Sequence, residues 1–180
     1  MNIKETLLQN VYILEPAVFH DKRGFFMESY NKRILEQLGI LVDFIQDNHS
    51  FSKNAGLIRG LHYQLIPKAQ TKLVRVSTGA IFDVIVDIRK NSVTFGEWIG
   101  VILSEENKRQ VFIPKGFAHG FCTLVPNTNV IYKVDEYYEP EFDRGILWND
   151  PDIRIDWPIS NPLLSDKDSK LPLLKYIEWS

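Results

Sequence analysis

The chain has 180 residues, of which 44% are hydrophobic and 24% are charged, and its formal net charge is −2. This balance is that of an ordinary globular protein, and it argues against a broad nucleic-acid-binding surface. The longest apolar runs are interrupted by aspartate and fall far short of the roughly 20 residues that a membrane helix needs. The N-terminus lacks the layout of a signal peptide. We therefore expect a cytoplasmic protein with one domain over residues 1–180.

Signals for α-helix are few. The run "NKRILEQLG" (31–39) has Asn31 in the position of an N-cap and Gly39 in the position of a stop, and its leucines and isoleucine share one side. We expect one short helix here.

The middle of the chain is predicted to form β-strands. Residues 81–89 alternate with period 2, which predicts one core face and one face that carries Asp83 and Asp87. Further strands are predicted at 72–78, 97–104, 110–114, 119–125 and 129–138. Strands at this spacing indicate an antiparallel barrel or sandwich. The tail at 148–172, rich in Pro, Asp and Trp, is expected to wrap the body as loops and short helical turns.

Two histidines and the single cysteine are candidates for chemistry. His62 lies in "RGLHYQ", without a second histidine or a glutamate close behind it, so a compact three-ligand metal set is missing. His119, in "IPKGFAHGF", follows a Pro-Gly turn that places it at the mouth of the expected barrel. Either histidine can equally be a hydrogen-bonded structural residue. Cys122, in an apolar run, is expected to be a small buried residue.

Two polar segments near the N-terminus could bind a nucleotide. In "DKRGFFMESY" (21–30), an arginine stands beside two phenylalanines, a combination that suits a phosphate together with a flat base. The segment "QDNHS" (46–50) supplies amide and carboxylate groups that can read a base edge or a sugar hydroxyl. Each segment can also be a polar turn between strands.

Seven ordered segments resemble the dTDP-4-dehydrorhamnose 3,5-epimerase family. They are "RGFFMESY", "QDNHS", "RGLHYQ", "KLVRVSTGAIFDVIVDIRKNSVTFGEW", "IPKGFAHGF", "GILWNDPDI" with "IDWP", and "LSDKD" with "LP". The resemblance runs from about residue 10 to 172. It implies an all-β, cupin-type jelly-roll barrel with a few short peripheral helices, usually a homodimer, with no metal and no organic cofactor.

The family resemblance also implies an isomerase. Its substrate would be dTDP-4-dehydro-6-deoxy-D-glucose, whose C3 and C5 both lie alpha to the C4 carbonyl, and its product dTDP-4-dehydro-L-rhamnose. His62 matches the base, Asp168 its carboxylate partner, Tyr132 the proton donor and Lys72 the group that stabilises the enolate. Three alternatives stay open: an epimerase that inverts one centre, a 3,4-ketoisomerase, and a binding module without activity.

The same resemblance assigns substrate contacts. The positions that match are Arg23, Glu28, Gln46, Asp47, Asn48, Arg59, His119, Tyr138, Asp143 and Lys167. Tyr138 is expected to stack on the base. Asp143 stands where many relatives are expected to have the longer glutamate. Asp83 is expected either to support the pocket from behind or to be structural.

Overall fold

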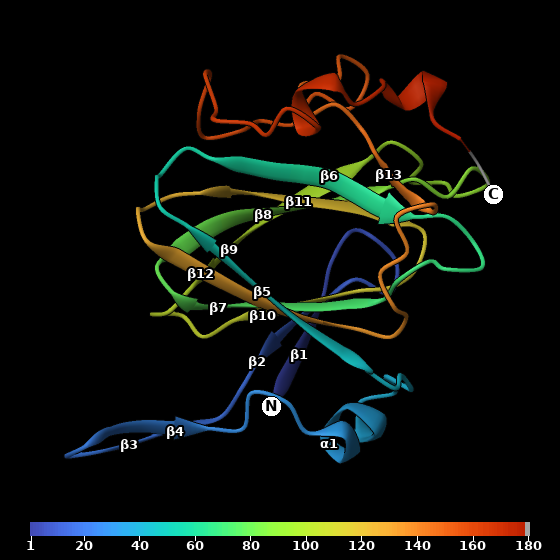
Figure 1. Cartoon of the computed structure of the whole chain (residues 1–180). Coiled ribbons are helices and arrows are strands. Elements are labelled where there is room, and N and C mark those ends of the chain that lie inside the picture. Colours follow the sequence, from blue (N-terminus) through green and yellow to red (C-terminus); the bar gives the residue numbers. More distant parts are fainter. Residues whose placement is uncertain (179–180) are drawn as a thin grey trace.

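The computed structural model describes residues 1–178, and it consists mainly of two antiparallel sheets that face each other (Figure 1). The first sheet contains, in spatial order, β1 (Asn2–Glu5), β2 (Tyr12–Glu15), β10 (Gln110–Ile113), β7 (Lys72–Thr78), β12 (Thr128–Val134) and β5 (Gln46–Ser52). The second contains β13 (Asp143–Gly145), β6 (Ile58–Gln64), β11 (Phe117–Thr123), β8 (Ala80–Asp87) and β9 (Trp98–Ser104). The chain crosses repeatedly between the sheets, as in a barrel closed from two layers.

The six strands predicted in the middle of the chain are confirmed, with small differences at their ends. The sequence patterns do not predict β1, β2 or β5. The first two are only four residues long, and β5 carries the polar run 46–50, which lacks apolar alternation. These strands are stabilised by pairing within the sheet, β1 with β2, β2 with β10 and β5 with β12, so their local sequence shows little strand pattern.

The main core lies between the two sheets. It contains Val74, Ile85, Val111 and Val130, all of them buried. Strand β8 differs from the expectation of one core face and one polar face, because both of its faces are buried. The side that carries the aspartates faces the barrel interior with Ile85, and the other side packs under the C-terminal segment.

The C-terminal segment covers the outer face of the second sheet (Figure 1). It has two short 3₁₀ turns, η1 (Asp168–Lys170) and η2 (Leu174–Tyr176), as expected for the tail. Its buried side chains Trp157 and Leu174 pack on Val84 and Val86 of β8. This segment therefore completes the second layer of the core and brings η1 against β6.

The N-terminal part adds a helix and a hairpin. Helix α1 (Lys32–Gln37) begins where predicted, and the Asn31 side chain accepts a hydrogen bond from the Ile34 amide. Strands β3 (Val18–Asp21) and β4 (Gly24–Met27) form a separate hairpin that projects from the body (Figure 1). None of the helices in residues 1–178 is long and apolar enough to cross a membrane.

Candidate active site

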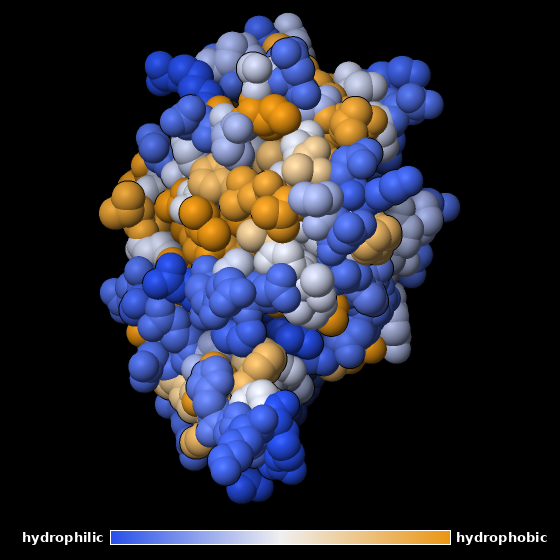
Figure 2. All heavy atoms as spheres, turned by 90° about the vertical axis from the view of Figure 1, so that its left-hand side faces the viewer, coloured by the Kyte–Doolittle hydropathy of each residue, from blue (hydrophilic) through white to orange (hydrophobic). Residues whose placement is uncertain are grey.

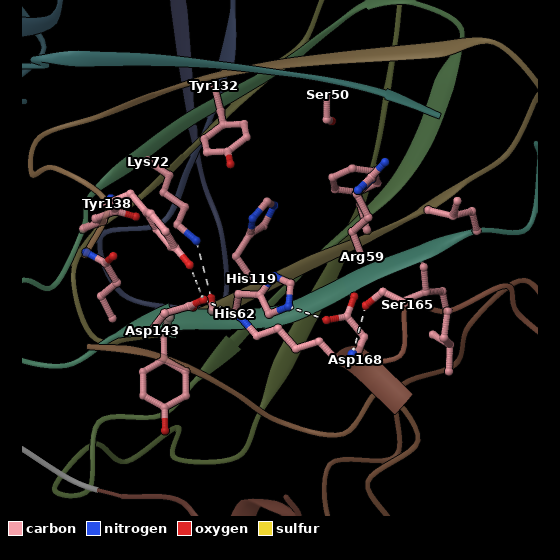
Figure 3. Close-up of a pocket in the computed structure, with 18 of the residues that line it drawn as sticks. Ser50, Arg59, His62, Lys72, His119, Tyr132, Tyr138, Asp143, Ser165 and Asp168 are labelled. Carbon is pink, nitrogen blue, oxygen red and sulfur yellow. Dashed lines mark hydrogen bonds and ion pairs between the residues drawn. The ribbon is translucent and has the colours of Figure 1, made fainter. Parts of the chain in front are cut away.

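A cavity of about 500 Å³ lies between the two sheets and the C-terminal segment. It brings together nine of the residues predicted to act on the substrate, from both sheets and from the tail (Figure 3). These are Arg59, His62, Lys72, His119, Tyr132, Tyr138, Asp143, Lys167 and Asp168. Cys122 does not line it; the cysteine is buried and free, as expected, and burial raises the pKa of its thiol to about 11.

His62 and Asp168 form a hydrogen-bonded pair in this cavity. The His62 Nε2 atom lies 2.7 Å from Asp168 Oδ1. The histidine side chain is 32% exposed and the aspartate 5%, so the carboxylate lies behind the ring. Burial alone would raise the pKa of Asp168. The pKa instead lies below its usual value, because His62 donates a hydrogen bond and interacts favourably with the carboxylate charge, and because the Gly60 amide donates a second hydrogen bond. The anionic carboxylate holds one ring nitrogen and leaves the other for a substrate, which is the arrangement of a general base and its orienting acid.

Two glycines permit the backbone arrangement that places His62. Strands β6 and β11 pair at His62 with His119, but the register shifts by one residue before Arg59 and Phe121. Gly60 has a φ of 117°, and a Cβ there would lie 2.6 Å from the Cα of Gly120. The strands can approach this closely only because both positions lack side chains.

Lys72 is a buried cation in the cavity wall. Its Nζ atom lies 3.4 Å from the backbone oxygen of His62, and the residue is 8% exposed. Burial lowers its pKa to about 8, against the opposing charges of Asp143 and Asp83. The ammonium form therefore still dominates at neutral pH, in a place where it can stabilise a developing negative charge.

Tyr132 reaches the cavity from β12, in the sheet opposite His62 (Figure 3). Burial raises the pKa of its phenol, and the charge of Arg59 opposes this rise only in part. The hydroxyl thus keeps its proton at neutral pH and can donate it. A base on one sheet and an acid on the other suit proton removal and return on opposite faces of a substrate.

At the rim of the cavity, the Asp143 carboxylate binds two other predicted substrate contacts, Tyr138 and Lys167. The Tyr138 hydroxyl donates to Asp143 Oδ2 over 3.0 Å, and the Lys167 ammonium pairs with the same oxygen. Gln64, at the end of "RGLHYQ", donates to the Tyr137 backbone oxygen and accepts from the Glu139 amide. Gln64 thus braces the loop that carries Tyr138, a role that the sequence analysis missed.

Other cavity residues were also missed by the sequence analysis. They include Ser50, Gln70 and Ser165. The Ser165 hydroxyl accepts a hydrogen bond from the Asp168 amide and so fixes the start of η1. The period of β5 could have revealed Ser50, because residues 46, 48 and 50 of a strand share a face.

Five predicted nucleotide contacts do not line the cavity of this single chain: Arg23, Glu28, Gln46, Asp47 and Asn48. On β5, Asn48 pairs with Tyr132 and Gln46 accepts a hydrogen bond from the Tyr138 amide, so these two share the cavity side of the sheet. Asp47 points to the opposite side, where it pairs with Lys133 at 2.7 Å.

Arg23 lies farther away, on the projecting hairpin. Its side chain is 90% exposed and pairs with Asp21, and Glu28 accepts a hydrogen bond from Asn31 just after the hairpin. The hairpin forms a two-stranded sheet of its own, separate from the two sheets that enclose the cavity. The contacts predicted for both residues stay predictions.

Within residues 1–178, no group of three or more His, Cys, Asp or Glu side chains is arranged to hold a metal ion. The His62 and His119 rings each hydrogen-bond to a different aspartate, which occupies one nitrogen of each ring. The cavity side chains can donate and accept hydrogen bonds and can exchange protons with a bound substrate.

The fold and the cavity together define the class of protein. It is an all-β barrel of the cupin type whose cavity carries acid–base groups on facing sheets. The chain belongs to the dTDP-4-dehydrorhamnose 3,5-epimerase family, because the model of that family matches residues 5–176. The resemblance found in the sequence is confirmed.

Three known proteins illustrate the similarity. The dTDP-4-dehydrorhamnose 3,5-epimerase of Shigella flexneri is 57% identical over 93% of both chains. The corresponding enzyme of Bacillus anthracis, in a crystal structure with TDP and PPi bound, is 60% identical with a TM-score of 0.94, and the match covers 96% of this chain and 98% of that one. A Legionella pneumophila dTDP-6-deoxy-D-glucose-3,5-epimerase, crystallised with dTDP-4-keto-L-rhamnose, is 50% identical with a TM-score of 0.93, covering 98% and 94%.

Proposed function

We propose that this protein is an isomerase that converts dTDP-4-dehydro-6-deoxy-D-glucose to dTDP-4-dehydro-L-rhamnose by inverting C3 and C5. The observation that carries the proposal is the His62–Asp168 pair at 2.7 Å in a cavity that Tyr132 enters from the opposite sheet. Family membership supplies the substrate class.

The reaction begins with proton removal beside the C4 carbonyl. The free nitrogen of His62 takes the proton from C3 or C5, and Asp168 stabilises the imidazolium that forms. The C–H electron pair forms a double bond to C4, and the π electrons of the carbonyl move to its oxygen, which becomes the enolate oxygen. Lys72 offers a positive charge to this oxygen from within the protein, where it needs little reorganisation.

Inversion requires that the proton returns on the other face. Tyr132 donates its phenolic proton to the same carbon, and the electrons of the enolate form the new C–H bond. Exchange with solvent then restores the neutral histidine and the protonated tyrosine. The same base and acid serve the second carbon after the sugar ring changes its position relative to them.

The first test is incubation of the purified protein with dTDP-4-dehydro-6-deoxyglucose in D₂O, followed by NMR. We expect deuterium at both C3 and C5, and a rhamnose-type product once a 4-keto reductase is added. Uptake at C3 or C5 alone would assign the chain to the single-centre epimerases. A carbonyl that moves from C4 to C3 without exchange at C5 would assign it to the 3,4-ketoisomerases, and no exchange would contradict catalysis on this substrate.

The proposal includes a homodimer in the cytoplasm. Arg23 and Glu28, predicted to contact the nucleotide, do not line the cavity of their own chain, which favours contact with a nucleotide bound in a second copy. Phe19 and Phe26 on the hairpin are 64% and 66% exposed. Figure 2 also shows apolar side chains gathered on one face of the molecule, with hydrophilic ones around them. Exposed apolar surface of this kind favours association.

Mixed dimers test this arrangement. His62→Ala removes the base but leaves the hairpin intact, and Arg23→Ala removes a hairpin contact but leaves the base. If the hairpin serves the neighbouring copy, subunits exchanged between these two weak variants restore one complete site, and activity rises above that of either variant. A monomer by light scattering, or no gain on mixing, would contradict the shared site.

A further inference from the structure

Strand β6 ends in a glutamine whose amide is engaged within the protein. Gln64 is 7% exposed and follows His62 by two positions, at the wall of the cavity. Its Nε2 atom donates to the backbone oxygens of Lys68 and Tyr137, and its Oε1 atom accepts from the Glu139 amide over 2.8 Å. An amide nitrogen has two hydrogens to donate, so Gln64 has no donor left for a substrate.

These hydrogen bonds flank Tyr138. The Tyr137 oxygen and the Glu139 amide belong to the residues immediately before and after it, in the loop that joins β12 to β13. The Tyr138 phenol is held at its far end by Asp143, over 3.0 Å (Figure 3). Asp143 is itself the partner of Gln64 across strands β13 and β6. The backbone and the ring of Tyr138 are therefore both positioned from the same end of β6.

Other contacts hold the two ends of this loop, residues 135–142. At its start, residues of the β6–β7 loop hydrogen-bond to Asp135 and Glu136. At its end, the Leu65 amide donates to the backbone oxygen of Phe142 over 3.0 Å. These bonds fix where the loop leaves β12 and where it enters β13, but they do not reach its centre.

The centre of the loop, residues 137–139, depends mainly on Gln64. Besides the bond of the Tyr138 phenol, the described part of the chain supplies three hydrogen bonds to the centre from outside the loop. Two of them come from Gln64, and the third is a longer bond of 3.4 Å from the Tyr138 amide to Gln46. Tyr138 is 53% exposed, so packing does little to hold it. A loop that is already fixed in the free protein loses less conformational freedom when a ligand binds.

We propose that Gln64 is a positioning residue that holds Tyr138 ready for the nucleotide end of the substrate. It thereby raises the affinity for the substrate and leaves the rate of the chemical step to His62 and Tyr132. The inference rests on the proposed function, because it takes Tyr138 as a contact of the dTDP group.

Gln64→Leu tests this role. Leucine fills a similar volume but has no polar atom, so the centre of the loop loses both of its bonds to β6. We expect KM and the Kd for dTDP to rise about 10-fold, while kcat changes less than about 3-fold. Tyr138→Ala should weaken dTDP binding, and adding Gln64→Leu to it should weaken binding no further, because both changes act through the same ring. Lys68→Met, which removes an ion pair to the start of the same loop, is the matched control and should leave KM and kcat unchanged.

Three results would overturn the inference. They are a wild-type Kd for dTDP in Gln64→Leu, losses of affinity that multiply in the double variant, and a fall in kcat without a change in KM. The last result would show that Gln64 acts on the neighbouring base instead.

A measurement on the wild type keeps the inference falsifiable even if Gln64→Leu does not fold. In the protein without ligand, the Glu139 amide should exchange with D₂O about 10²-fold more slowly than an unstructured amide, because it is bonded to Gln64. Addition of dTDP should change this rate little. Free exchange without ligand, with protection only after dTDP is added, would refute a loop that is fixed in advance. Failure of the proposed function is seen separately, as a wild-type protein that exchanges no deuterium into the substrate.

Discussion

The Nε2 atom of His62 lies 2.7 Å from Oδ1 of Asp168, although 106 positions separate the two residues in the chain. The contact exists because the C-terminal segment folds back over the second sheet and places η1 against β6. The same carboxylate also accepts a hydrogen bond from the Gly60 amide, over 3.4 Å. The base is thus oriented by a part of the chain that has no sequence proximity to it.

Replacing His62 by alanine should abolish most of the activity. Removal of a general base typically costs about 10²- to 10⁴-fold in rate. The measurement is kcat for the coupled reaction, with circular dichroism to show that the fold is kept. His49→Ala is the matched control, since His49 is exposed and bonds to Asn129 on the strand surface. Activity near that of the wild type in His62→Ala would remove His62 from the mechanism.

Tyr132→Phe should separate binding from inversion. The variant keeps the ring but loses the proton that we assign to the opposite face, so we expect KM to change little and kcat to fall about 10²-fold or more. NMR in D₂O then reports each carbon separately, and deuterium can still enter from the side of His62 without inversion. Full inversion at both C3 and C5 would exclude Tyr132 as the donor.

Lys72→Met should raise stability while it lowers activity. Folding lowers the pKa of Lys72 from 10.5 to about 8, mainly because the side chain is buried. This shift reduces the free energy of unfolding by about 3 kcal/mol at neutral pH. We expect the free energy of unfolding to rise by up to this amount, and kcat to fall about 10²-fold. Because Lys72 binds its proton more weakly in the folded chain, its destabilising contribution disappears as pH rises from about 8 to 10.5. Urea titrations should therefore show the stability difference between Lys72→Met and the wild type narrowing across that window, whereas the difference for the exposed control Lys53→Met should not change with pH.

Gly60→Ala should destabilise the fold more than an ordinary glycine substitution. A Cβ at Gly60 would lie 2.6 Å from the Gly120 Cα and 2.8 Å from the His119 oxygen, at a φ of 117°. We expect a loss of about 3 kcal/mol from the clash and the backbone strain together. Gly39→Ala is the control, because Gly39 also has positive φ but has open space around it, and it should cost about 1 kcal/mol. Equal losses in urea titrations would show that the close contact has no energetic effect.

Asp87→Asn should reveal a stabilising carboxylate outside the cavity. Burial alone would raise the pKa of Asp87, but hydrogen bonds from Arg89, Ser92 and Thr94 lower it to about 2. This pKa is below the unfolded value of 3.8, so the Asp87 anion adds about 2 kcal/mol to the free energy of unfolding at pH values above 3.8. The contribution should disappear as pH falls through about 2. A stability difference between wild type and variant that does not change with pH would contradict this account.

The sequence by itself determined the strands of the middle region, the helix cap at Asn31 and the types of residue available for chemistry. These features depend on local periodicity and on short-range hydrogen bonds, so neighbouring residues suffice to predict them. The family resemblance then pointed to His62, Asp168, Tyr132 and Lys72 together. Without the family resemblance, no local pattern in the polar tail would have indicated a role for Asp168.

Only the tertiary structure decided how these residues meet. It showed that both faces of β8 are buried, that Asp83 lies behind His119, and that Asp47 turns away from the cavity. It also placed Arg23 on a hairpin outside the cavity of its own chain. The physical reason is that burial and charge pairing arise from contacts between segments far apart in sequence. A strand's pattern shows which residues share a face, whereas the layer that packs against that face is set by the rest of the chain.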